Sequence, residues 1–145
     1  MTAYRGEPFL RESWEEKTQR EKTDQTLEEK AWKVFQTIEE IAENYPELAK
    51  FAEDIKSSIL RYGKIIERRK QAIRSSNREE IETSDQEQRI AHNALIDSLN
   101  ILSRQCRNKE VSNLWRQDIG IERDQITAWA MRVYKTLESL EEKVN

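Results

Sequence analysis

The chain has 145 residues, of which 37% are charged and 36% hydrophobic, and its formal net charge is −3. This length suits one domain with its own core. The sequence contains no apolar run of about 18 residues and no signal peptide, so we expect a cytoplasmic protein without a membrane partner. Its one cysteine, Cys106, cannot form an internal disulfide and should pack as a small hydrophobe.

Residues 1–23 are expected to form an N-terminal tail ahead of a single helical-bundle domain at residues 24–145. Phe9, Leu10 and Trp14 are the main apolar anchors of this tail, and no hydrophobic residue occurs from Glu15 to Thr26. The simpler interpretation is a mobile or marginally helical tail. The alternative is a short motif that docks on a partner or on the bundle.

The first helix is predicted from Thr26 to about Asn44, because Thr26 and Glu29 fit the capping-box spacing. Pro46 lacks an amide donor and disfavours helical geometry at Tyr45, which predicts a tight turn there. The apolar spacing continues across Pro46, so a single kinked helix is the alternative.

The second helix is expected from Pro46 to residue 77 or 80. Gly63 weakens its middle, or else admits a closely packed neighbouring helix. Residues 75–77 and 83–85 are predicted to form the next connection. Ser84 and Glu87 fit a second capping box, so the third helix is expected from there to about Arg107.

The last region is predicted to contain a short extra helix near residues 109–118, followed by a final helix at about 122–143. A continuous helix from Lys109 through Gly120 is the alternative to the shorter one. Gly120 suits a helix C-terminus, with Ile121 packing beyond it.

Apolar residues recur every three or four positions along all four main segments, which places each set on one helical face. These sets are Leu27, Ala31, Val34, Ile38, Ile41 and Tyr45; Leu48, Ala52, Ile55, Ile59, Tyr62 and Ile66; Leu95, Leu99, Leu102 and Cys106; and Ile126, Ala130, Val133, Leu137, Leu140 and Val144. The predicted fold class is all-α, a mainly antiparallel four-helix bundle with coiled-coil-like packing. Trp32 or Trp115 would mark either the core or a dimer surface.

Residues 56–78 form a basic segment, with 8 basic side chains and 1 acidic one. The candidate binding residues for an anionic or protein partner are Arg61, Lys64, Arg68, Arg69, Lys70, Arg74 and Arg78. Arg69 falls in the apolar heptad phase, so it is expected at a helix interface with an acidic partner. The simplest interpretation of the whole segment is charge complementarity with the acidic first helix. The alternative is an anionic ligand, either nucleic-acid phosphate or an acidic protein surface.

The third helix carries a polar row that flanks its apolar stripe and is a candidate hydrogen-bonded network. Its members are Arg89, His92, Asn93, Asp97, Asn100 and Arg104. His92 has no nucleophile or orienting acid at a suitable spacing, so we expect it to be a semi-buried histidine at the edge of the core. Residues 89–104 resemble a segment of an uncharacterised family of small bacterial all-helical proteins. That resemblance implies no activity.

The sequence contains no catalytic motif, no metal-ligand pattern and no phosphate-binding loop, so no cofactor, metal or small-molecule substrate is expected. The primary hypothesis is a non-enzymatic protein-interaction module, such as an adaptor, an inhibitor or an immunity-like factor. It would bind a protein partner, or a second copy of itself, through its helical faces. The alternative is a nucleic-acid-associated accessory protein that uses the basic helix at 56–78.

Overall fold

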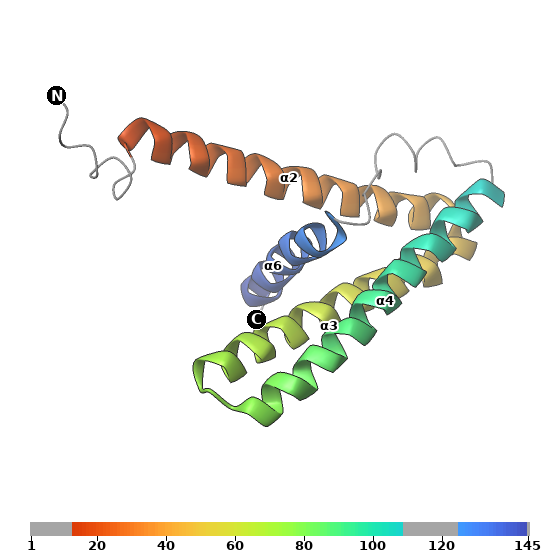
Figure 1. Ribbon diagram of the computed structural model, residues 1–145. Helices are drawn as coiled ribbons and strands as arrows, with labels where there is room; N and C mark the ends of the chain where they lie inside the picture. The colour runs from red at the N-terminus through yellow and green to blue at the C-terminus, as the bar shows by residue number, and fades with distance from the viewer. Residues whose placement is uncertain (1–12, 109–124, 145) are drawn as a thin grey trace. The chain divides into compact units, whose positions relative to one another are not determined.

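The computed structural model describes residues 13–108 and 125–144, and all of its regular structure is helical (Figure 1). Helix α2 spans Trp14–Asn44, α3 spans Ala49–Arg74, α4 spans Arg78–Asn108 and α6 spans Ile126–Val144; a short 3-10 helix, η2, spans Pro46–Leu48. These helices confirm the all-α bundle predicted from the apolar spacing. The expected short helix near residues 109–118 lies outside the described residues.

The chain divides into two compact units, Met1–Lys30 and Ala31–Asn145. Within the first unit, α2 is a polar helix whose Trp14 side chain is 79% exposed and whose Leu27 is 37% exposed. Leu27 was expected in the core and is not part of it.

Helix α2 begins twelve residues earlier than predicted, at Trp14 instead of Thr26. The hydroxyl of Ser13 accepts a hydrogen bond of 3.0 Å from the backbone N–H of Glu16, which is the N-cap geometry. Thr26 lies inside the helix, where its hydroxyl donates to the carbonyl of Lys22. The capping box at Thr26 was therefore wrong, and the same sequence pattern at Ser13 and Glu16 marks the real start.

The predicted turn before Pro46 is confirmed. Tyr45 leaves helical geometry with φ −132° and ψ 83°, and Pro46 opens the short helix η2. Because proline has no N–H to donate, it suits this first position. The chain then continues into α3.

A tight turn at residues 75–77 joins α3 to α4, and the two helices pack side by side as a hairpin (Figure 1). Ser76 has φ 54°, and the N–H groups of Ser76 and Asn77 donate to the carbonyls of Ile73 and Ala72. This is the Schellman pattern, which satisfies the last carbonyls of α3. Asn77 then caps α4 by accepting a bond of 3.1 Å from the N–H of Glu80.

Helix α4 therefore begins at Arg78, and the predicted connection at 83–85 was wrong. Ser84 is fully buried, and its hydroxyl donates to the carbonyl of Glu80 at 2.7 Å. A serine bonded in this way is compatible with a helix interior, so its cap-like spacing to Glu87 was misleading.

One hydrophobic core joins residues 31–44 of α2 with α3, α4 and α6. Its buried members are Ala31, Phe35, Ile38, Ile41, Leu48, Ala52, Ile55, Ile59, Tyr62, Ile65, Ala91, Leu95, Leu99, Leu102, Cys106, Ile126, Trp129, Ala130, Val133, Tyr134 and Leu137. Hydrogen bonds connect α6 to α2 and to α3: Trp129 Nε1 donates to the carbonyl of Ala31, and the Tyr62 hydroxyl donates to Thr127 Oγ1, both at 3.2 Å. No helix among residues 13–108 and 125–144 is both long and apolar enough to cross a membrane.

Gly63 lies where α6 meets α3. A Cβ atom built at this position would lie 2.3 Å from Cγ of Tyr134 and 2.4 Å from its Cδ1. The missing side chain is what lets the tyrosine ring lie directly on the α3 backbone. Of the two interpretations of Gly63, close helix packing is the one that the structure shows.

Candidate functional site

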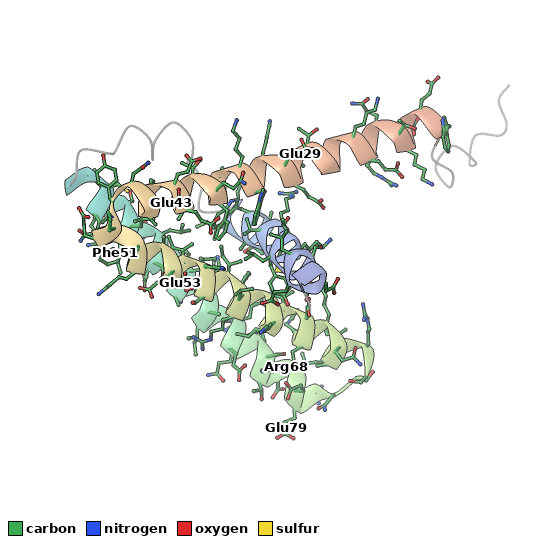
Figure 2. The ribbon with its side chains drawn as sticks, turned by 180° about the vertical axis from the view of Figure 1, so that it is seen from behind. Glu29, Glu43, Phe51, Glu53, Arg68 and Glu79 are labelled. Carbon is green, nitrogen blue, oxygen red and sulfur yellow. The ribbon has the colours of Figure 1, made fainter. Side chains whose placement is uncertain are left out.

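The centre of the basic segment is paired with α4. Arg68, labelled on α3 in Figure 2, binds Glu80 through Nε at 2.7 Å and also binds Glu87. The bond to Glu87 is the main reason that the pKa of Arg68 is raised. Arg69 approaches Asp85 with Nε 3.5 Å from Oδ1, which confirms the expected contact with a neighbouring helix. The acidic partner is α4, so the expected complementarity with the first helix is wrong for these two arginines.

The other candidate cations are exposed, and within the described part of the chain they form no ion pair or side-chain hydrogen bond. They are Arg61, Lys64, Lys70, Arg74 and Arg78. Their sequence spacing places these five residues in one basic segment with Arg68 and Arg69. Spacing alone does not show which of the basic side chains form ion pairs with a neighbouring helix.

Three of these cations lie at the end of the α3–α4 hairpin, where Figure 2 labels Glu79. Lys70 and Arg74 are one turn apart on α3, and Arg78 is the first residue of α4. Ile73 lies between Lys70 and Arg74 in the sequence, at a position that continues the spacing of the buried residues of α3. It is nevertheless 48% exposed. We call Lys70, Ile73, Arg74 and Arg78 the hairpin-end surface.

The polar row on α4 does not form the expected network. Arg89 Nη2 donates to Asp85 Oδ2 at 3.1 Å. No side-chain hydrogen bond forms among His92, Asn93, Asp97, Asn100 and Arg104 in the described structure. His92 is half-buried, with its ring tilted against Tyr62 at a centroid distance of 5.9 Å.

A hollow of about 290 Å³ lies between the C-terminal part of α2 and the start of α3, a feature that sequence spacing did not reveal. It is lined by Phe35, Glu39, Ala42, Glu43, Ala49, Ala52, Glu53 and Lys56. Burial raises the pKa of Glu39, and the nearby Lys56 partly opposes that shift. Lys56 is thus a basic residue of the segment that acts on the acidic first helix.

The described residues contain no group of three or more His, Cys, Asp or Glu side chains that would hold a metal ion. Cys106 is fully buried, and burial raises the pKa of its thiol, as expected for a packed and unreactive cysteine. Trp32 stacks on Phe35 at a centroid distance of 5.3 Å and packs against the core. Trp115 lies outside the described residues.

No family model, no curated protein and no solved structure matches this chain. The surfaces described above are therefore the basis for a functional proposal.

Proposed function

We propose that this protein is a non-enzymatic protein-interaction module that binds an acidic segment of a partner protein through the hairpin-end surface. The observation that carries the proposal is the exposure of Ile73. The apolar phase of α3, buried at Ile55, Ile59 and Tyr62, continues to Ile73, which is 48% exposed. Lys70 and Arg74 are its neighbours on α3, and Arg78 begins α4 after the turn; none of the three has a carboxylate partner in the described structure.

An exposed aliphatic side chain among free cations suits a partner segment with both acidic and apolar side chains. The apolar contact would supply affinity, and the opposite charges would speed association and orient the segment. Between residues 70 and 78 the chain has three basic side chains and no acidic one, which favours an anionic partner at these positions. Glu79 and Glu80 follow directly at the start of α4, and Glu80 is paired with Arg68.

A nucleic-acid partner is the second candidate, and the free cations are the observation that favours it. The surface differs from a typical single-strand site because Ile73 offers no aromatic ring for base stacking. Arg68 and Arg69 are also paired with carboxylates of α4, so their charges are not free to bind phosphate groups. We therefore place nucleic acid second.

The proposal includes a cytoplasmic location, where the single thiol of Cys106 would stay reduced. It also includes the absence of catalysis, since the described structure shows His92 in a ring contact with Tyr62 and without a side-chain hydrogen bond that would orient it as a base.

The test compares the wild type with a Lys70→Glu/Arg74→Glu/Arg78→Glu variant in affinity capture from the cells that make the protein. A Lys33→Glu/Lys135→Glu variant is the control, since both lysines are exposed and lie on other helices. We expect a stoichiometric protein partner that the hairpin-end variant loses and the control keeps. Equal capture by all three proteins would contradict the proposal.

Titration with labelled DNA and RNA at two salt concentrations tests the second candidate. Binding that weakens with salt and is lost in the hairpin-end variant would establish nucleic acid as the partner instead. We expect no oligonucleotide binding at physiological salt.

A further inference from the structure

The outward face of α4 carries a second stripe of residues spaced at alternating intervals of three and four. Its members are Thr83, Glu87, Ile90, Ala94, Asp97, Ile101 and Arg104. Ile90 is 55% exposed and Ile101 is 37% exposed, and neither belongs to the bundle core. The buried stripe of α4, which includes Ala91, Leu95 and Leu102, is rotated by about 100° around the helix from this second stripe, because Ala91 and Leu102 directly follow Ile90 and Ile101.

We propose that this outward face of α4 binds the same face of a second copy in an antiparallel dimer. In an antiparallel pair, Ile90 of one copy would pack against Ile101 of the other. Glu87 lies three residues before Ile90, and Arg104 lies three residues after Ile101. Each Glu87 would therefore face the Arg104 of the second copy, and a two-fold axis produces both pairs at once.

The charges select this arrangement over the parallel one. In a parallel pair each residue meets its own copy, so Glu87, Asp97 and Arg104 would all meet like charges, which is unfavourable. In the antiparallel pair, Asp97 lies opposite the small Ala94. Glu87 already accepts a bond from Arg68, but a carboxylate has further lone pairs for a second guanidinium.

The apolar contact is small and the two Asp97 side chains lie near the axis, so the dimer should be weak. The dimer surface consists of α4 residues alone and does not include Ile73 of α3, so it does not depend on the proposed function.

The test is sedimentation velocity over a range of protein concentrations on the full chain and on two single variants, Glu87→Arg and Arg104→Glu. Each variant alone places like charges opposite each other twice per dimer, so its dissociation constant should rise by at least about tenfold. An equimolar mixture of the two variants should restore the dimer, because the arginine introduced at position 87 would then face the glutamate introduced at position 104. Far-UV circular dichroism checks that each variant is folded.

A matched pair of isoleucine substitutions separates this surface from the hairpin end. Ile90→Glu should abolish the dimer, whereas Ile73→Glu should leave it unchanged. A wild type that stays monomeric, single variants that dimerise as the wild type does, or a mixture that stays monomeric would each overturn the proposal. Loss of the dimer in Ile73→Glu but not in Ile90→Glu would also overturn it and place self-association at the hairpin end.

Discussion

For the Gly63→Ala variant, the structure and simple helix propensity predict opposite changes in the free energy of unfolding. Alanine is favoured over glycine inside a helix by about 1 kcal/mol, so propensity alone predicts a more stable protein. In the structure, the new methyl group would lie 2.3 Å from Cγ of Tyr134 and 2.6 Å from its Cδ2. Carbon atoms prefer separations of about 3.5–4.0 Å, so the ring or the helix would have to move by roughly 1 Å.

The ring of Tyr134 cannot easily move. Its side chain is 2% exposed, and its hydroxyl donates to Glu138 Oε2 at 3.1 Å. Overpacking of this kind costs about 1–3 kcal/mol. After the propensity gain of about 1 kcal/mol, we expect Gly63→Ala to lower the free energy of unfolding by up to about 2 kcal/mol, or Tm by up to about 8 °C.

Urea unfolding followed by circular dichroism measures this change, and a double-mutant cycle provides the control. In a Tyr134→Ala background the clash is gone, so Gly63→Ala should become stabilising by up to about 1 kcal/mol. If Gly63→Ala stabilised the otherwise wild-type protein by that amount, the close packing of α6 on α3 would be refuted.

Three further substitutions test local features of the hairpin and the hollow. Ser76→Gly should raise the free energy of unfolding by about 0.5–1 kcal/mol, because φ 54° is unfavourable for serine and free for glycine; a lower stability in urea would contradict this. Arg69→Met should leave the free energy of unfolding unchanged or raise it, because Arg69 Nε is buried without a hydrogen bond and Asp85 keeps Arg89 as a partner. A decrease in the free energy of unfolding of more than about 1 kcal/mol would contradict this and show that the 3.5 Å contact of Arg69 with Asp85 is stabilising. Burial raises the pKa of Glu39, so the ionised side chain destabilises the folded state at a pH above that raised pKa. Glu39→Gln should therefore raise Tm at pH 7, and this gain should vanish as the pH falls toward 4.5, the ordinary pKa of a glutamate. A gain in Tm that is the same at both pH values would contradict that assignment.

The sequence was most informative where one residue has a strong local effect. Pro46 determined the break at Tyr45, and the three-four spacing identified most of the buried residues because a helix repeats every 3.6 residues. The burial of Cys106 followed from the same spacing.

Helix starts were harder, because a capping box is a short pattern that also occurs inside helices. Ser13, Thr26 and Ser84 each precede a glutamate by three residues, and only Ser13 caps a helix. An internal hydroxyl can bond to the carbonyl four residues earlier, so the same residue type fits both positions. The polar segment after Ser13 gave no apolar spacing that would have favoured the earlier start.

Predicting the ion-pair partners of the basic segment required the correct start of α4. A start of α4 at Ser84 leaves Glu80 at the end of the second helix or in the connection after it, so its contact with Arg68 from a separate helix was not predicted. Helical spacing shows which side chains share a face, but the neighbouring helix is known only once the turn at residues 75–77 is placed. The exposed Ile73 was missed for the same reason, since its phase alone predicts burial.

Site-specific photo-crosslinking at position 73 tests the proposed function most directly. An apolar photo-reactive amino acid would replace Ile73 in the cells that make the protein, and the same amino acid at the exposed position of Gln36 on α2 would serve as the control. We predict a crosslink from position 73 to one other protein, through an acidic segment of that protein, and none from position 36. Equal crosslinking from both positions, or a crosslink from position 73 to nucleic acid, would contradict the protein-interaction function.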